Sequence, residues 1–148
     1  MLENFTHVLV TTDFSPTGDH AIAHAFRMAA DHGAEVILCH VVDVVPPPNP
    51  LYAHYEPTDT FRPERAIEEA RQALLKRVPT SGALAKVPYR TAVVEGTAAD
   101  EILRVANDEH ADLVVIATHG RGMLKHVLMG STAERVVRHA TCPVLVVR

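Results

Sequence analysis

The sequence predicts an α/β protein whose core is an open parallel sheet of five strands, covered by helices on both faces. Two patterns support this fold class. Five short apolar segments rich in β-branched residues recur along the chain, and segments with helical periodicity separate them. Strands that alternate with helices form parallel βαβ units, and strands without polar alternation are typical of a sheet buried on both sides. Because the chain has 148 residues, we expect one domain over residues 1–148.

The first βαβ unit has clear boundary signals. Residues 7–12 (HVLVTT) form an apolar, β-branched run, which predicts the first strand. Ser15 then provides an N-cap, Pro16 suits the first helical position, and Gly33 provides a C-cap. Residues 36–42 repeat the strand pattern. A strand, a helix and a strand in this order predict that the first two strands are parallel.

Residues 44–63 interrupt this alternation with a long connection. Six of the ten prolines of the chain fall in it, beside Tyr52 and Tyr55. A connection of this length is either a mobile excursion or a functional flap, and nothing in its composition fixes a ligand. Both interpretations stay open.

The second half of the chain continues the alternation of helices and strands. Predicted helices cover residues 65–78, the segment that opens at Gly96-Thr97 and the segment from Ser131; predicted strands cover residues 89–94, 113–117 and 144–147. We expect the strand order 3-2-1-4-5, in which the winding direction reverses between the first and fourth strands. Ligands bind such sheets beyond the carboxyl ends of the strands at that reversal. Thr12, Asp13 and residues 118–120 follow those two strands and are expected to line the site.

Composition and charge argue against several classes of protein. Lys and Arg number 14 against 18 Asp and Glu, a net charge of −4 without a cationic cluster, so we expect no nucleic-acid partner. The longest apolar runs are strand-sized, and the N-terminus lacks the pattern of a secretory signal, so we expect a cytoplasmic protein without a membrane span. Cys39 and Cys142 lie beside apolar strands without metal or redox spacing, and we interpret them as reduced core residues.

A glycine-rich turn follows the fourth predicted strand. Three of the seven glycines, Gly120, Gly122 and Gly130, lie in it. Glycines let backbone amides approach an anion closely, and the helix that begins near Ser131 adds its own unsatisfied amides. Ser131 and Glu134 have capping-box spacing, which predicts Ser131 as the N-cap. From these residues alone, a structural turn with its cap and a phosphate site are equally good interpretations.

Other familiar sites are not supported by the sequence. The turn lacks the third glycine of a dinucleotide-binding fingerprint, because Lys125 stands there, and no Walker loop occurs. His20 and His24 have a spacing that can bind zinc, but no third ligand is evident and a solvated helix face is the simpler interpretation. Apart from Asp13 and His119, the expected pocket supplies no nucleophile or base for phosphoryl transfer. We therefore expect neither a catalytic residue nor a metal site built by the protein alone.

Four motifs, taken in order, resemble the universal stress protein family. They are TTDFS at residues 11–15, CHVVD at residues 39–43, the turn over residues 118–132, and CPVLVV at residues 142–147. The resemblance covers essentially the whole chain apart from the proline-rich loop. The nucleotide-binding branch of that family has the signature glycine, two residues, glycine, nine residues, glycine, then serine or threonine. This chain matches it at Gly120, Gly130 and Ser131, and departs from it at Ala117, where the first glycine is expected.

The resemblance implies a fold of the adenine nucleotide alpha hydrolase type and an ATP-binding, stress-response switch with at most slow ATP hydrolysis. AMP or another adenine nucleotide could replace ATP, and Mg²⁺ or Mn²⁺ would bridge phosphate oxygens. A homodimer paired through residues 144–147 is also implied, and an uncovered apolar edge strand favours such pairing. The alternative is a nucleotide-free dimeric interaction module of the same fold, for which Ala117 is the best argument. An adenylyl-transfer enzyme is less favoured, because no Ser-Gly-Gly loop follows the first strand.

The resemblance further implies roles at the base and sugar end of the pocket. Asp13, with Thr12 beside it, would bind the ribose or the end that carries the metal and phosphates. Val41 would contact adenine, opposite a wall made by Ile116 and Ala117. Taken from the residues alone, Asp13 could equally form an Asx-turn, and Val41 is most simply a core residue of a strand.

At the phosphate end, the resemblance implies backbone contacts. Gly120 and Gly130 would donate their amides to the phosphates, joined by the hydroxyl and amide of Ser131 and the amide of Thr132. His119 would contact phosphate or ribose, although a histidine in a loop is more often not a ligand.

Overall fold

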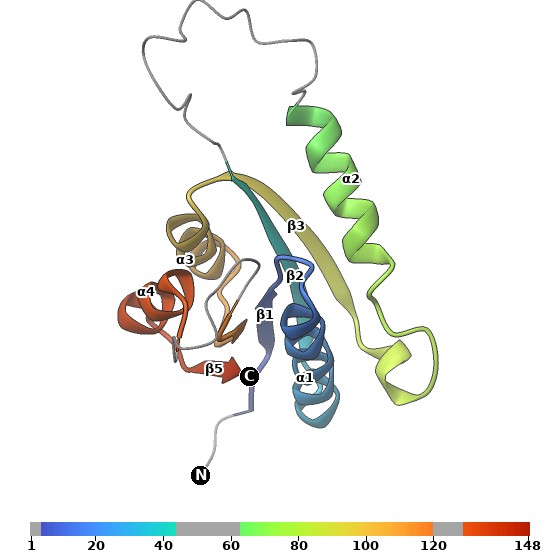
Figure 1. Ribbon diagram of the computed structural model, residues 1–148. Coiled ribbons are helices and arrows are strands. Elements are labelled where there is room, and N and C mark those ends of the chain that lie inside the picture. The colour runs from blue at the N-terminus through green and yellow to red at the C-terminus, as the bar shows by residue number, and fades with distance from the viewer. Residues whose placement is uncertain (1–3, 44–62, 120–128) are drawn as a thin grey trace, which may run out of the picture.

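The structure, a computed structural model, describes residues 4–43, 63–119 and 129–148. Its centre is one sheet of five parallel strands, drawn as arrows in Figure 1. The strands are β1 (His7–Thr11), β2 (Glu35–Asp43), β3 (Tyr89–Gly96), β4 (Leu113–Ala117) and β5 (Val144–Val147). They lie in the order β3-β2-β1-β4-β5, which confirms the predicted order. The reversal of winding therefore falls between β1 and β4.

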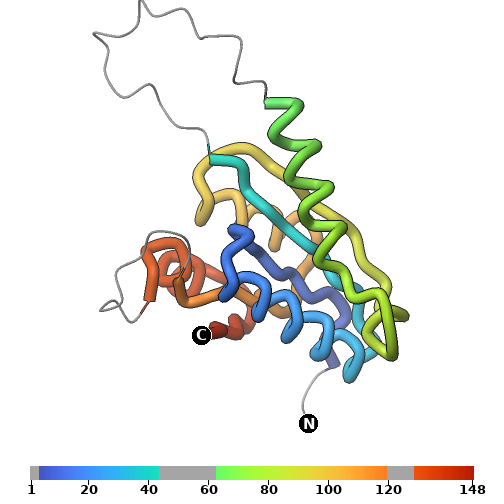
Figure 2. The backbone as a smooth tube through the Cα atoms, turned by 45° about the vertical axis from the view of Figure 1, so that its right-hand side comes forward, coloured from blue at the N-terminus to red at the C-terminus, as the bar shows by residue number. Residues whose placement is uncertain are grey.

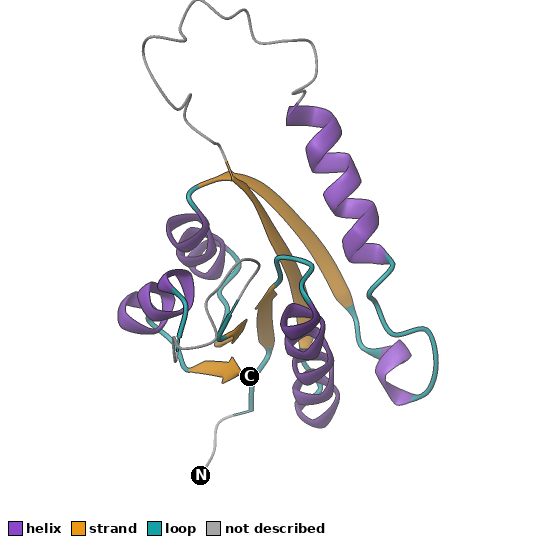
Figure 3. Ribbon diagram, in the orientation of Figure 1, coloured by secondary structure: helices purple, strands orange, loops and turns teal. Residues whose placement is uncertain are grey.

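Helices cover both faces of the sheet and give three layers, as the purple and orange ribbons of Figure 3 show. The helices α1 (Pro16–His32) and α2 (Pro63–Leu75) lie on one face, and α3 (Ala98–Asp108) and α4 (Ser131–His139) lie on the other. Figure 2 shows α1 and α2 running along the same side, with the short 3₁₀ helix η2 (Ala83–Lys86) between α2 and β3. The predicted fold class is confirmed.

Alternate residues of each strand point to opposite faces, which divides the core into two clusters. Val8 and Val10 of β1 belong with Phe26 of α1, whereas Leu9 between them belongs with Ile102 of α3. All five side chains are buried. Because both faces of the sheet are covered, the central strands carry consecutive apolar residues, as residues 8–10 and 36–39 do, which is the pattern that predicted them.

The boundaries of α1 follow the signals in the sequence. The Ser15 hydroxyl accepts a hydrogen bond from the Gly18 amide at 3.1 Å, and Pro16 is the first helical residue. At the other end Gly33 adopts the left-handed conformation with φ of 68°, and its amide donates to the Ala29 carbonyl. The predicted N-cap and C-cap are both confirmed.

The N-cap of α4 differs from the prediction, and that of α3 agrees with it in position. Gly130, not Ser131, is the N-cap of α4, because Gly130 is extended and its carbonyl accepts the Glu134 amide at 2.9 Å. Ser131 is already the first helical residue, so the predicted Ser131 cap is wrong. Thr97 is the N-cap of α3, where the sequence predicted the start of this helix, but its side chain makes no capping hydrogen bond.

Several element boundaries also differ from the prediction. The second predicted helix, over residues 65–78, is α2, which begins at Pro63 and ends at Leu75, and Arg77 and Val78 continue it only as turns. Strands β2 and β3 extend to Asp43 and Gly96, and these two residues form the last pair at the C-terminal ends of the two strands. Of the connection over residues 44–63, residues 44–62 lie outside the described residues, so both interpretations of it remain predictions.

The two cysteines are free thiols in the core. Cys39 is completely buried, and burial raises the pKa of its thiol to about 12. Cys142 packs against the same cluster, and burial again raises its pKa, with the nearby Asp112 carboxylate adding to the shift. Neither thiol has the lowered pKa of a reactive cysteine, which agrees with their interpretation as core residues. Among the described helices, none is long and apolar enough to cross a membrane.

Asp112 joins the beginning of β4 to the beginning of β1. Its carboxylate accepts the Thr6 amide at 2.8 Å, the Thr6 hydroxyl at 2.7 Å and the His7 amide at 3.1 Å. Partial burial by itself raises the pKa of this carboxyl group, but the hydrogen bonds from Thr6 and His7 outweigh burial, so the pKa of Asp112 is lowered.

Because the folded pKa of Asp112 lies below the unfolded one, its contribution to stability is complete above the unfolded pKa of about 4 and is lost as the pH falls through the folded pKa. We expect Asp112→Asn to lower the free energy of unfolding by about 1 kcal/mol at pH 7, and by less at pH 3. Denaturant unfolding of both proteins at the two pH values measures this. Asp31→Asn, at an exposed position of α1, is the control, and an equal loss at both pH values would contradict the ionic contribution.

Candidate functional site

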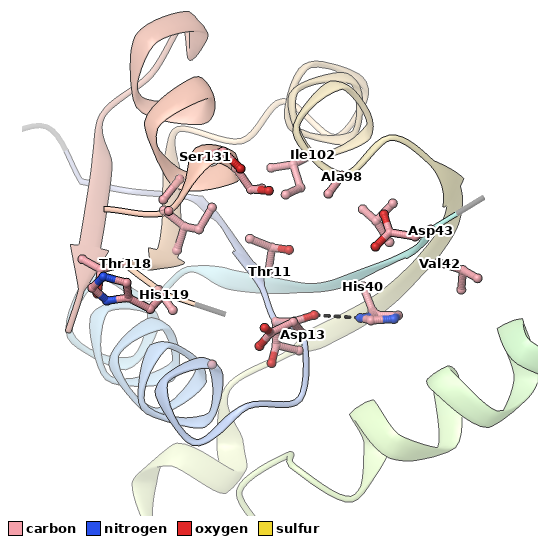
Figure 4. Close-up of a pocket in the computed structure, with 18 residues that line it drawn as sticks. Thr11, Asp13, His40, Val42, Asp43, Ala98, Ile102, Thr118, His119 and Ser131 are labelled. Carbon is pink, nitrogen blue, oxygen red and sulfur yellow. Dashed lines mark hydrogen bonds between the residues drawn. The ribbon is translucent and has the colours of Figure 1, made fainter. Parts of the chain in front are cut away.

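A pocket of about 520 Å³ lies beyond the carboxyl ends of β1, β2 and β4. The first turns of three helices border it, through Gly18 of α1, Ala98 of α3 and Ser131 of α4 (Figure 4). Pockets of roughly 300 to 1,000 Å³ hold small ligands and cofactors. The pocket therefore lies where the strand order predicts a ligand, at the reversal between β1 and β4.

Nine of the ten residues predicted for the site line this pocket. They are Thr12, Asp13, Val41, Ile116, Ala117, His119, Gly130, Ser131 and Thr132. The tenth, Gly120, lies outside the described residues. The chain thus brings together four segments that are far apart in the sequence, although the pocket alone does not assign their roles.

Further residues line the pocket that the sequence analysis did not select. They are Thr11, Gly18, His40, Val42, Asp43, Ala98, Ile102 and Ala133. Thr118, which the strand order predicted at the site, lines the pocket as well. Thr11, His40 and Asp43 are part of the motifs TTDFS and CHVVD, so their position beside selected residues was a usable signal. Ala98 and Ile102 gave no signal beyond helical periodicity, because their place in the pocket depends on how the first turn of α3 approaches β2.

The turn between β1 and α1 is held by its own hydrogen bonds. The Thr12 hydroxyl accepts the Phe14 amide at 3.0 Å, and the Asp13 carboxylate accepts the Ser15 amide at 3.0 Å. The second bond is the Asx-turn that the sequence allowed for Asp13. It uses one carboxylate oxygen, Oδ1, and does not prevent Asp13 from lining the pocket.

Gly18 lets this turn lie close to the first turn of α1. A Cβ atom on Gly18 would be 2.5 Å from the Thr12 hydroxyl oxygen and 3.2 Å from Asp13 Oδ1. Glycine in a helix costs about 1 kcal/mol relative to alanine, so its presence here is explained by the close approach and not by helix propensity.

We expect Gly18→Ala to destabilise the protein by about 1 to 3 kcal/mol despite the better helix propensity of alanine, because the added methyl group overlaps the Thr12 hydroxyl. Thermal unfolding measures the effect. In a Thr12→Ala background the overlapping oxygen is gone, so the same substitution should cost much less. An equal cost in both backgrounds would mean that the overlap with Thr12 is not the cause.

The first turn of α4 presents unsatisfied backbone amides to the pocket. The Gly130 amide donates to the Thr118 carbonyl at 2.6 Å. The phosphate contact that the resemblance implies for this amide stays a prediction. The first intrahelical bond is made by the Glu134 amide, and the N-cap residue Gly130 has no side chain with which to cap the helix. The backbone amides of Ser131 and Thr132, in the first turn of α4, therefore have no carbonyl acceptor within the helix. Both residues line the pocket, so these amides can bind an anion there.

Thr118 adds an unpaired polar group beside these amides. Its hydroxyl is buried and has no hydrogen-bond partner among the described residues, although its backbone amide donates to the Val147 carbonyl at 2.7 Å. A buried hydroxyl that lines a pocket and has no protein partner is usually satisfied by a ligand or an ordered water.

The two sides of the pocket differ in charge. Figure 4 shows Ser131 of α4 on one side and the Asp43 carboxylate, at the end of β2, on the other. The apolar residues Val41, Ile102 and Ile116 also line the pocket, and all three belong to the α3 and α4 face of the core. This arrangement suits a ligand with an anion at one end and a flat, apolar body that carries hydrogen-bond donors at the other.

The described residues contain no group of three or more His, Cys, Asp or Glu side chains that could hold a metal ion. His20 and His24 therefore do not belong to such a cluster within that part of the chain. His119 lines the pocket next to Thr118.

Comparisons with known proteins agree in one family. A sequence profile described as the universal stress protein family matches residues 4–148. A universal stress protein of Methanocaldococcus jannaschii is 35% identical over 145 residues, 97% of this chain and 82% of that protein. A universal stress protein of Thermus aquaticus is 34% identical and covers 97% of this chain and 99% of its own length.

Solved structures show the same fold. A second M. jannaschii universal stress protein superposes with a TM-score of 0.80 at 28% identity, over 98% of this chain and 96% of that one. A universal stress protein solved in complex with cyclic AMP has a TM-score of 0.65 at 24% identity and covers 99% of this chain and 98% of its own. At 24% identity, the similarity to the cyclic AMP complex shows a shared fold and no more.

Proposed function

The chain belongs to the universal stress protein family, and from this premise we propose that it binds ATP or another adenine nucleotide in the pocket beyond β1, β2 and β4. The bound nucleotide acts as a switch in a cytoplasmic stress response, with at most slow hydrolysis. We limit the proposal to binding. Four side chains that line the described pocket could act as a base, namely Asp13, His40, Asp43 and His119. Of these, Asp13 already accepts the Ser15 amide and His40 already bonds to the Thr12 carbonyl.

One observation carries the proposal, the polarity of the pocket. The uncapped amides of α4 provide the positive end of a helix dipole, which favours phosphate. The Asp43 carboxylate on the opposite side repels phosphate and accepts hydrogen bonds, which favours an amino or hydroxyl group. Val41 and Ile116 provide the apolar surface that a purine ring needs between those two ends.

Ala117 does not argue strongly for a nucleotide-free pocket. Its methyl group packs with the core cluster around α1, whereas its neighbour Ile116 belongs to the opposite cluster together with Val41. The extra methyl group therefore points away from the face where a purine would lie. With Ala117 present, the pocket still has a volume of about 520 Å³.

Related structures support the capacity of the fold for such ligands. One universal stress protein was solved with cyclic AMP, and another, from Archaeoglobus fulgidus, with dAMP. At 24% and 16% identity they support the fold only, so the residues of this chain must carry the assignment. Mg²⁺ or Mn²⁺ would arrive with the phosphates and be held mainly by phosphate oxygens and water, with Asp13 the carboxylate available to contribute a ligand.

Calorimetric titration of purified, nucleotide-stripped protein with ATP and Mg²⁺ tests the proposal. We expect one nucleotide per chain with a dissociation constant in the micromolar range, and weaker binding of inorganic triphosphate, which lacks the purine. AMP and cyclic AMP as further titrants determine which adenine nucleotide is preferred. If no nucleotide gave either heat or a thermal shift, the proposal would be contradicted and the nucleotide-free dimeric module would be favoured.

A further inference from the structure

The turn that carries Asp13 contains a strained residue. Phe14 has φ of 67°, and among the described residues only Phe14, His110 and three glycines have a positive φ. A bulky side chain in this conformation is a backbone outlier, and such strain persists only where the surroundings hold it in place. Phe14 immediately follows Asp13, so whatever holds Phe14 also sets the direction of the Asp13 carboxylate.

Two side chains from other elements lie against the Phe14 ring. The His40 ring of β2 has its centroid 4.3 Å from that of Phe14, and the Arg77 guanidinium carbon lies 4.7 Å above the ring. Both also bond to the backbone of the turn. His40 Nδ1 donates to the Thr12 carbonyl at 2.8 Å, and Arg77 Nη2 donates to the Phe14 carbonyl at 3.4 Å.

Arg77 is itself fixed, although it does not line the pocket. Its Nε forms an ion pair with Asp19 of α1 at 2.7 Å, and its Nη1 donates to the Ala73 carbonyl of α2 at 3.0 Å. The Arg77 side chain is 27% exposed. The side chain of Arg65, which forms an ordinary surface ion pair within α2, is 80% exposed. Arg77, in the turn that follows α2, is thus bound to the turn that borders the pocket.

We infer that Arg77, Phe14 and His40 form a positioning stack that holds the β1–α1 turn so that Asp13 stays directed at the nucleotide, and that Arg77 sets nucleotide affinity without touching the nucleotide. This inference rests on the proposed function. It makes α2 part of the binding apparatus, since the guanidinium, the aromatic ring and the imidazole come from three separate elements and meet only at this turn.

Four variants test the stack by calorimetry with ATP and Mg²⁺, each beside a melting curve without nucleotide. Arg77→Lys keeps a charge for Asp19 but loses the planar fork, and Phe14→Leu keeps apolar volume but loses the ring. We expect each to bind ATP roughly tenfold more weakly, the effect of misplacing one hydrogen bond to a charged group. Phe14→Tyr keeps the ring and should therefore lose less affinity for ATP than Phe14→Leu. Arg65→Met removes the ordinary ion pair with Glu69 and should leave the affinity unchanged.

A double-mutant cycle separates positioning from general packing. In an Asp13→Asn background, Arg77→Lys should cause little further loss, because the group that it positions is already impaired. Variants that melt earlier but bind ATP as tightly as the parent would overturn the inference and leave the proposed function intact. If Arg77→Lys lowered the ATP affinity equally in the parent and in the Asp13→Asn background, the inference would also be overturned and the proposed function would stand. A parent protein that binds no nucleotide would overturn both. If Phe14→Leu does not fold, Arg77→Lys and its cycle decide alone.

Discussion

Gly130→Asp is expected to weaken ATP binding by about a hundredfold or more, whereas Gly130→Ala should bind within a few-fold of the parent. The reason lies in the position of Gly130 as the N-cap of α4. An aspartate at an N-cap places its carboxylate over the amides of the second and third helical residues. Here those are Thr132 and Ala133, beside Ser131 at the end of the pocket that favours an anion, so the carboxylate would occupy and repel the site of the phosphate.

The backbone angles of Gly130 and its place as N-cap both suit an aspartate, so we expect α4 to stay folded in this variant. Gly130 has φ of −68° and ψ of 159°, a conformation open to any residue. Aspartate is among the best N-cap residues and glycine is only slightly worse, so α4 should be as stable as before or slightly more stable. Loss of binding therefore cannot be attributed to unfolding of the helix.

Calorimetry and melting temperatures of the parent and of the Ala, Asn and Asp variants make the comparison complete. The Asn variant should lie between the other two, because its amide oxygen competes for the helix amides without repelling phosphate. Equal affinities for Ala and Asp would place the phosphate away from α4. The pocket would then still bind a nucleotide, but the proposed orientation, with the phosphates at α4, would be wrong.

The sheet could be predicted from the sequence because its strands are buried on both sides. Runs such as residues 36–39 and 113–117 carry consecutive apolar residues, many of them β-branched, and a parallel βαβ arrangement leaves few alternative strand orders. The helix ends were less predictable. Ser15 caps α1 as expected, but Ser131 is not a cap, because the backbone of Gly130 takes that place and a glycine carries no capping side chain to indicate it.

The site was predicted in part because its residues follow the ends of strands. Asp13 and His119 each lie one or two residues beyond a strand that borders the reversal of the sheet, so topology alone brings them together. Topology does not show which glycine permits a close approach. Gly18 is in the site because α1 begins against the Thr12 hydroxyl, a contact that depends on the path of the turn. Its only sequence signal is a glycine in the first turn of a helix, where alanine is preferred.

The stack on Phe14 shows the same limit more strongly. Arg77 is 63 residues from Phe14 along the chain, and nothing in its local sequence distinguishes it from a solvated arginine. Its guanidinium meets the turn only because α2 and α1 lie on the same face of the sheet. Side-chain contacts between elements that are not adjacent in sequence carry no periodic signal, so pattern analysis of one chain does not reveal them.

Val146→Pro is expected to convert a homodimer into a folded monomer. We propose that two copies pair through β5, which is an edge strand of the sheet in Figure 1. Its residues Val144, Leu145 and Val146 are only half-buried in the single chain, although all are apolar. An apolar edge strand with an open row of amides and carbonyls favours pairing with another strand.

The register of β5 makes proline at residue 146 a selective change. The Pro143 and Val147 carbonyls accept β4 amides, from Val114 at 3.0 Å and from Thr118 at 2.7 Å. Because the hydrogen bonds of a parallel pair alternate along each strand, the Val146 amide faces the open edge and the Leu145 amide faces β4. Proline is tolerated where the lost amide faces outward, so Val146→Pro should remove a bond between chains and none within the sheet.

Light scattering after size exclusion gives the mass of each variant, and melting curves give its stability. Leu145→Pro is the contrasting variant: it removes a bond to β4 and should cost about 3 kcal/mol or more of stability. Deletion from Val144 onward is a harsher change, because it also removes Val147, which is buried in the core, so monomer or aggregate is expected there. If the Val146→Pro protein remained a dimer with unchanged stability, pairing through β5 would be contradicted. The two copies would then have to contact each other through another surface.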